Sequence, residues 1–337
     1  MKIKKANWGL GIALVAFVFI LNLSWGSVHI PFKEVIRILT GQEGTKASWD
    51  YIVLHYRLPK AIVAMLVGIA LSLSGLLMQT LFRNPMAESY VLGISAGAGL
   101  GVALVLMGGA LLPTFLTPYL TSNYALLVTS VLGSLLLLLL ILSVSYRVKN
   151  AITVLIVGLM FGSFANAIIA ILTYFSEADQ LKKYVVWMSG SLGNLTKEMI
   201  VLFLIVVSLG VVLALFLIRR LDALLLGDAY AASLGINVKQ TRNLIIITTS
   251  LLAGGATAFV GPIAFVGLAV PHMARLLWKT NTHRPLIGAC IWMGSLVLLV
   301  CDMLTQIQDQ VMLPINAITA IFGAPIVIVL LFKYRIF

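Results

Sequence analysis

The stretch from Arg219 to Arg242 reads RRLDALLLGDAYAASLGINVKQTR and lies between two long apolar runs. Gly227 and Gly235 can each end a short helical turn, and Asp228 is placed to cap the turn between them. The stretch therefore predicts two short helices outside the membrane. Their apolar face comprises Leu221, Leu224, Leu225, Ala229, Ala232 and Leu234. Such a face either rests on lipid headgroups or binds a soluble partner.

Composition defines the environment of the chain, because 61% of its 337 residues are hydrophobic and only 10% are charged. A soluble protein of this size needs more polar surface, so the sequence predicts an integral membrane protein surrounded by lipid. Several runs reach the roughly 20 apolar residues that a membrane-spanning helix needs. We expect an all-α, polytopic fold in which residues 1–337 form one transmembrane domain. Ten spans are expected, at about 8–26, 61–82, 92–108, 124–145, 152–174, 197–218, 241–259, 263–277, 285–303 and 314–333.

The distribution of charge predicts the orientation. Ten spans put both termini on one side, and that side then holds 15 of the 23 Lys and Arg residues but only 3 of the 11 acidic residues. Basic residues accumulate in cytoplasmic segments, so we expect a multi-pass protein of the cell membrane with both termini and the 219–242 stretch in the cytoplasm. The net charge of +12 is then explained by topology and gives no indication of nucleic-acid binding.

Catalytic and metal-binding motifs are missing from the sequence. It contains no HExxH or GxxxxGK[ST] pattern, and its one GxSxG match, at 93–97, lies inside the expected apolar span 92–108 and not at a strand-to-helix turn. Any ATP that drives the protein is therefore bound by another chain. Cys290 and Cys301 would lie about 16 Å apart along one helix, too far for a disulfide. We expect His272 to make a structural hydrogen bond and expect no cofactor, metal site or catalytic residue. A membrane enzyme and a secondary carrier remain rival classes, and the carrier is disfavoured because the spans hold almost no carboxylates.

Two regions rich in Gly and Pro interrupt the apolar pattern. One joins the second and third spans, and the other lies five spans later, which is consistent with an inverted repeat. Helices broken in this way either line a translocation path or allow close packing. The residues that carry this prediction are Gln79, Asn84, Pro85, Gly93, Gly97, Gly267 and Pro271.

Two cations flank a proline at the outer end of the second span, in the sequence Arg57-Leu58-Pro59-Lys60. Cations at this position commonly anchor a helix at the membrane interface. The alternative is a docking point for an acidic partner outside the cell.

Several motifs occur together in an order typical of one family. Arg57-Leu58-Pro59-Lys60 resembles an RLPR motif, and the segment from Ser74 to Glu88 resembles SGxxxQxxxRNPLA. Leu92–Ala98 matches a Gly-rich third span, Trp187–Leu192 resembles WxxGSL, and Phe265–Arg275 is very similar to FVGLxxPHxxR. This set resembles the FecCD-type permeases, the membrane subunits of ABC importers for iron–siderophore complexes, haem and vitamin B12.

The resemblance implies partners and a function. The family forms a dimer with a second permease subunit, identical or homologous, and the substrate passes between the subunits. ABC ATPase subunits bind the coupling stretch in the cytoplasm, and an extracellular or periplasmic substrate-binding protein docks outside. Arg57 and Lys60 would pair with acids of the binding protein. The residues that would contact the ATPase are Leu226, Gly227, Asp228, Ala229, Ala231, Ala232, Leu234 and Gly235.

The chain also departs from the family pattern. Lys60 replaces an arginine, Gln306 stands four residues after Asp302 where the family often has arginine, Asn316 stands where the family usually has glycine, and Tyr230 is unusual among the small residues of the coupling stretch. The Gln306 departure puts docking at that corner in doubt. We expect a permease that moves an iron chelate inward, with vitamin B12 as the alternative substrate.

Overall fold

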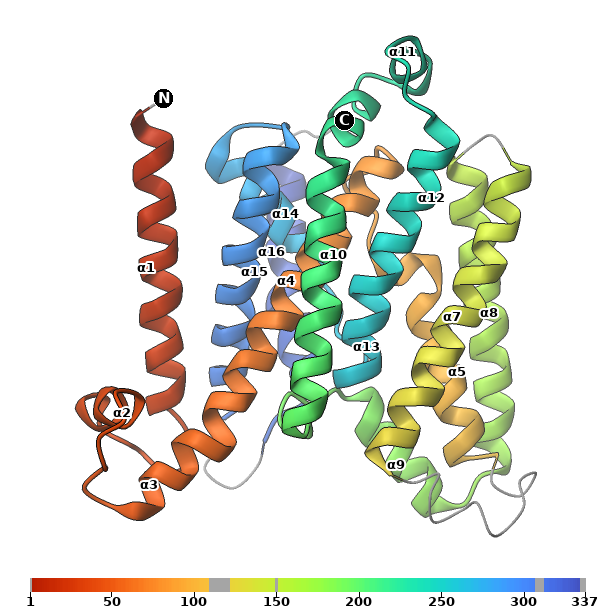
Figure 1. The fold of residues 1–337 in the computed structure, drawn as a ribbon. Coiled ribbons are helices and arrows are strands. Elements are labelled where there is room, and N and C mark those ends of the chain that lie inside the picture. Colours follow the sequence, from red (N-terminus) through yellow and green to blue (C-terminus); the bar gives the residue numbers. More distant parts are fainter. Residues whose placement is uncertain (1, 109–121, 149–150, 307–311, 334–337) are drawn as a thin grey trace.

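The computed structural model describes residues 2–108, 122–148, 151–306 and 312–333, which form a bundle of roughly parallel helices without a β-strand in these ranges (Figure 1). Six helical segments of this described part are long and apolar enough to cross a membrane. The all-α, polytopic prediction is therefore confirmed. The ten predicted spans correspond to α1 (Lys2–Ser24), α4 (Leu58–Leu81), α5 (Ile94–Leu106), α7 (Asn123–Arg147), α8 (Ala151–Phe175), α10 (Lys197–Leu224), α12 (Val238–Thr249) continuing through a π-turn into α13 (Gly255–Val260), α14 (Val266–Trp278), α15 (His283–Leu304) and α16 (Ile315–Lys333).

Helix α4 forms the centre of the bundle. It packs against α10, α12, α14 and α15, and nearly all of its residues from Ala61 onward are buried. Backbones approach closely at its glycines: a Cβ added to Gly68 would lie 2.1 Å from the carbonyl oxygen of Gly294, and one added to Gly75 would lie 1.8 Å from that of Gly267. Only residues without a side chain permit this spacing.

The second close contact joins α5 and α7. A Cβ added to Gly97 would lie 2.6 Å from the carbonyl oxygen of Gly133, and one added to Gly101 would lie 2.1 Å from that of Thr129. Gly93, just before α5, has a φ of 76° and also lies against Gly158 and Gly162 of α8. The repeat of glycine at every fourth residue thus faces two neighbouring helices.

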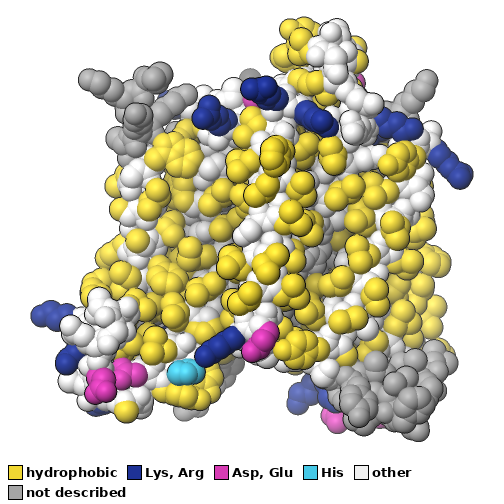
Figure 2. Space-filling view, in the orientation of Figure 1, with side chains coloured by type: hydrophobic (Ala, Val, Ile, Leu, Met, Phe, Trp, Pro, Cys, Tyr) yellow, Lys and Arg dark blue, Asp and Glu magenta, His cyan; other side chains and the backbone are white. Residues whose placement is uncertain are grey.

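The outer faces of α7, α8 and α10 carry many exposed large apolar side chains, which contribute to a broad apolar belt in Figure 2. Lys and Arg side chains form a row at one end of this belt, and the acidic side chains visible on this face lie mostly at the other end. Figure 1 marks both ends of the chain on the basic side. Two of the basic residues in the predicted cytoplasmic set, Lys149 and Arg335, lie outside the described residues.

Short helices mark the two ends of the bundle. α11 (Asp228–Ser233) projects from the basic end, and α2 (Phe32–Leu39), α3 (Ala47–Ile52) and α9 (Ala178–Met188) lie at the opposite end (Figure 1). We refer to these as the α11 end and the α9 end.

Of the two short helices predicted between 219 and 235, one is observed and the other is the end of α10. α10 continues without a break to Leu224, six residues past the predicted end of that span, and only α11 is a separate short helix. The physical reason is the apolar stripe Ala214, Leu217, Leu221 and Leu224, which recurs every three or four residues and is buried along its whole length. The buried stripe extends the helix past the charged pair that follows the span.

Candidate functional site

Helix α11 is held between two glycines in conformations that other residues rarely adopt. Gly227 precedes it with a φ of 115°, and Gly235 follows it with a φ of 79°. The N–H of Gly235 donates to the carbonyl of Ala232, and the N–H of Ile236 donates to that of Ala231. These bonds satisfy carbonyls at the end of the helix, as a glycine C-cap does. The predicted role of Gly235 in ending the helix is therefore confirmed.

Asp228 does not cap α11, contrary to the sequence prediction. The N-cap residue is Gly227, which has no side chain to cap the helix, and Asp228 is the first residue of the helix. Its carboxylate instead forms an ion pair with the guanidinium of Arg83. A carboxylate in the first turn still interacts favourably with the positive end of the helix dipole.

The apolar face also differs from the prediction in part. Leu221, Leu224 and Ala231 are buried within the bundle, whereas Leu226, Tyr230 and Leu234 are 65%, 51% and 58% exposed. The exposed apolar surface, which we call the α11 knob, consists of Leu225, Leu226, Ala229, Tyr230, Ala232 and Leu234. It stands above the basic row and away from the apolar belt (Figure 2).

The chain between α4 and α5, residues 82–93, forms a hairpin that folds back toward the bundle. α4 ends at Leu81, the Oδ1 of Asn84 accepts from the N–H of Met86 at 2.9 Å, and the carbonyl of Pro85 lies 2.8 Å from Nε2 of His272. The break expected at Asn84 and Pro85 is observed, because proline cannot continue the helix. His272 makes the structural hydrogen bond predicted for it.

Pro271 lies inside α14 and explains a second contact of this region. Because proline has no N–H, the carbonyl of Gly267 loses its intrahelical donor. The side-chain amide of Gln79 lies 3.4 Å from that carbonyl and from the carbonyl of Leu268, and its Oε1 accepts a hydrogen bond from Arg275. The structure thus brings together Gln79, Gly267 and Pro271, three of the residues predicted for a path or a packing contact.

The predicted docking cations are turned inward. Arg57 is 8% exposed, and its guanidinium donates to the carbonyls of Leu23 and Ser24 at the end of α1 and to that of Val28 in the segment that follows. Lys60 forms an ion pair of 2.8 Å with Asp302, which is itself buried. Neither side chain projects from this subunit as a docking point would, so the contact with a binding protein stays a prediction.

Asp302 joins three helices at this corner. It also accepts a hydrogen bond from Asn22 at 2.9 Å, and the amide of Gln306 lies 3.4 Å from the same carboxylate oxygen. We call Asn22, Arg57, Lys60, Asp302 and Gln306 the Lys60 corner. An arginine at 306 would add a positive charge beside Asp302, where glutamine adds only a neutral donor.

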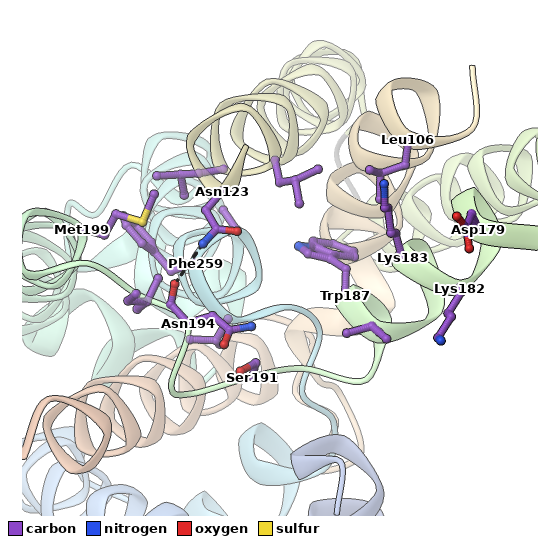
Figure 3. Close-up of a pocket in the computed structure, with 16 residues that line it drawn as sticks. Leu106, Asn123, Asp179, Lys182, Lys183, Trp187, Ser191, Asn194, Met199 and Phe259 are labelled. Carbon is purple, nitrogen blue, oxygen red and sulfur yellow. Dashed lines mark hydrogen bonds between the residues drawn. The ribbon is translucent and has the colours of Figure 1, made fainter. Parts of the chain in front are cut away.

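Two cavities open at the α9 end. One of about 690 Å³ is lined by Arg57, Lys60, Asp302 and Gln306 of the Lys60 corner together with the 189–194 loop and residues 312–315. The other, of about 520 Å³, lies between α9 and the ends of α7, α10 and α13 (Figure 3). There, Trp187 points toward the cavity and the amide of Asn123 donates to the carbonyl of Asn194 at 3.3 Å.

A polar cluster of Thr80, Asp222 and His283, which the sequence did not predict, joins α4, α10 and α15. Oδ1 of Asp222 accepts from the backbone N–H of His283 at 2.8 Å and lies 2.7 Å from its Nδ1, and Nε2 of the same ring lies 2.8 Å from Oγ1 of Thr80. The Asp222 carboxylate thereby caps the start of α15. The threonine is buried, so the arrangement joins helices and does not present a nucleophile.

The described residues contain no group of three or more His, Cys, Asp and Glu side chains that could hold a metal ion. Cys290 and Cys301 are both buried and free, as their separation predicted.

A helical membrane bundle with an exposed apolar knob at its basic end is the architecture of a transporter permease, and comparison with known proteins agrees. Residues 14–333 match the FecCD transport family, and the chain belongs to that family. It is 35% identical to YvrB of Bacillus subtilis, an uncharacterized ABC transporter permease, with 97% of this chain and 94% of YvrB covered.

Two further similarities span nearly the whole chain. The vitamin B12 import permease BtuC of Klebsiella pneumoniae is 33% identical, with 98% of this chain and 95% of BtuC covered. A solved structure presented as an inward-facing conformation of an ABC transporter assigned to the metal-chelate type superposes with a TM-score of 0.86 at 25% identity, covering 98% of this chain and 100% of the other. The protein is thus a multi-pass permease subunit of the inner membrane.

Proposed function

We propose that this chain moves an iron chelate into the cell, with ATP hydrolysed by separate ATPase subunits that bind the α11 knob. The observation that carries the proposal is the knob itself. Its apolar side chains are exposed on a part of the chain that projects beyond the apolar belt, which favours a protein partner over lipid as their cover (Figure 2). Burying a large apolar side chain contributes about 1.5–3 kcal/mol, so a groove that received several of them would bind this helix firmly.

The α11 end is the cytoplasmic end in this proposal. The row of Lys and Arg side chains lies there, and both chain ends are on the same side. Basic residues are retained in the cytoplasm during insertion, which supports this orientation over its inverse.

The α9 end would then receive the substrate-binding protein, and a second permease subunit, identical or homologous, would complete the pathway. The 690 Å³ cavity opens at this end and is lined partly by cationic side chains. The binding protein would therefore deliver a large chelate to the cavity beside the Lys60 corner.

Vitamin B12 is the alternative substrate, favoured by the similarity to BtuC. Iron chelates are favoured by the similarity to a metal-chelate type transporter. Proteoliposomes that contain the complex can be tested with radiolabelled cyanocobalamin and with a panel of ferric siderophores and haemin. ATP-dependent uptake of one class decides between them, and uptake without ATP would favour the rival secondary carrier.

A substitution in α11 tests the ATPase contact. Ala232 is exposed on the knob, so Ala232→Asp places a carboxylate where the ATPase would bury it, at a cost of several kcal/mol. We expect normal insertion but loss of ATPase co-purification and of uptake. Gln240→Asp is the matched control, because it adds the same charge at an exposed position on α12 outside the knob. Retention of the ATPase by Ala232→Asp would refute the proposal.

A further inference from the structure

Arg83, the second residue of the 82–93 hairpin, contacts α10 and α11 at the point where the two helices meet. Its Nε donates to the carbonyl of Leu224, the last residue of α10, at 3.1 Å. Its terminal nitrogen forms the ion pair with Asp228, the first residue of α11. Arg83 has a φ of 46°, a left-handed conformation that is uncommon for a residue with a side chain. The backbone turn directs the side chain away from its own helix and onto α11.

The other side of the same hairpin is attached to α14. The carbonyl of Pro85 is bonded to His272, and the carboxylate of Glu88 accepts hydrogen bonds from the backbone N–H groups of Phe265 and Gly267 at the start of that helix. Three residues of one short segment therefore contact three helices that are distant from it in sequence, α10, α11 and α14. α11 and α14 are joined through Arg83, Pro85 and Glu88.

We propose that Arg83 is a positioning residue that ties α11 to the hairpin, so that a displacement of α11 is passed to α14. The source of that displacement, an ATPase bound to the knob, rests on the proposed function. The link itself rests only on the contacts within this chain.

The chemistry of the link requires an arginine. The planar guanidinium presents Nε and a terminal nitrogen in one rigid fork, which here reaches a carbonyl and a carboxylate at once. Lysine could pair with Asp228 but could not hold the Leu224 carbonyl in the same fixed geometry. The ion pair is solvent-exposed and weak by itself, so the double attachment, not the charge alone, determines the position of α11.

The experiment measures whether α11 and α14 move together. Spin labels are placed at Ser233 on α11 and Leu277 on α14, both exposed and both outside the knob and the hairpin. The permease, alone and with its ATPase subunits, is studied in lipid nanodiscs before and after trapping with ATP and vanadate. We expect one narrow distance distribution in the otherwise unmutated chain in every state. Arg83→Ala should broaden it about twofold or more, while ATP hydrolysis stays within about twofold.

Conservative and matched variants distinguish the loss of the Arg83 link from a general disruption of the helix bundle. Arg83→Lys should broaden the distribution less than Arg83→Ala. Asp228→Asn should also broaden the distribution. The double variant Arg83→Ala/Asp228→Asn should be little broader than Arg83→Ala, because both substitutions remove the same ion pair. Arg219→Ala removes a positive charge from an exposed position near the end of α10 and should leave the distribution unchanged.

An unchanged distribution in Arg83→Ala, or equal broadening in Arg219→Ala, would overturn the link. Failure of the unmutated permease to bind any ATPase would instead refute the proposed function, and the distances in the permease alone would still decide whether Arg83 joins α11 to α14.

Discussion

The α11 knob and the Lys60 corner lie at opposite ends of one bundle and differ in the exposure of their side chains. At the corner, Lys60 and Asp302 are paired within the chain and shielded from solvent. At the knob, apolar side chains are exposed, and a Cβ added to Gly227 or Gly235 would meet no atom within 4 Å. The polar groups of the corner are paired within one subunit, whereas the knob leaves apolar side chains exposed. The knob is therefore the end where we propose that a partner binds.

The largest expected difference between the two ends is their accessibility across the membrane. Lys182→Cys on α9 should react fully with an impermeant maleimide in intact cells, and Ser233→Cys on α11 should react only after permeabilisation. Both positions are exposed, and the native cysteines are buried, which keeps the background low. Labelling in the reverse pattern would invert the orientation proposed for the protein.

The Lys60 corner should dominate the loss of stability. Asp302→Ala leaves Lys60 without its counter-charge and removes one of the two acceptors of the Asn22 amide, so we expect the free energy of unfolding to fall by about 3 kcal/mol. Denaturation of the purified permease in detergent measures this. A loss below about 1 kcal/mol would mean that solvent already screens the pair, and the corner would then be an accessible docking surface after all.

Gly235→Ala should weaken the partner contact at the knob and leave the corner intact. The φ of 79° costs a residue with a side chain about 1–2 kcal/mol, so we expect roughly tenfold weaker ATPase association. Pull-down of the ATPase subunits at graded concentrations measures the change. Gly193→Ala is the matched control, since a Cβ there also meets open space and its φ is not positive. Equal effects of the two substitutions would argue against a special role for the end of α11.

The smallest expected effect on stability belongs to Asp228→Asn. The Arg83–Asp228 pair has side chains that are 45% and 51% exposed, and exposed pairs contribute about 0.2–1 kcal/mol. The unfolding free energy should therefore fall far less than in Asp302→Ala under the same conditions. Similar losses of unfolding free energy for Asp228→Asn and Asp302→Ala would show that the ion pairs at the two ends contribute equally to stability.

The sequence predicted the fold well and the side-chain partners less well. Apolar runs and charge counts gave ten helices with both chain ends on the basic side, because these depend on residues near one another in the chain. Asp228 was expected to cap its own helix, but it pairs with Arg83, which is 145 positions away. Lys60 was expected either to anchor its helix at the membrane interface or to pair with a binding protein, and neither interpretation included its ion pair with Asp302, which is also far along the chain. Such partners are set by packing across helices, which local patterns do not contain.

The correct predictions at the site were those that a backbone requirement enforces. Gly235 ends α11 and Pro85 ends the extension of α4 because few other residues permit those geometries. The missed Asp222–His283 contact needed knowledge that α10 and α15 are neighbours. Leu221 and Leu224 were assigned to an exposed face because the preceding span was expected to end at residue 218, whereas α10 continues to Leu224.

The central position of α4 has a consequence for how the protein responds to bilayer thickness. Most of the apolar window of the segment that includes α4 is buried by protein, 83% of it, whereas 22% is buried for α8. A thinner or thicker bilayer acts on helices that touch lipid, which tilt to match the hydrocarbon depth. α8 and its outer neighbours would absorb such a mismatch, while α4, held by glycine contacts to α14 and α15, keeps its inclination. Acyl-chain length would then change the spacing of the outer helices around a fixed central axis.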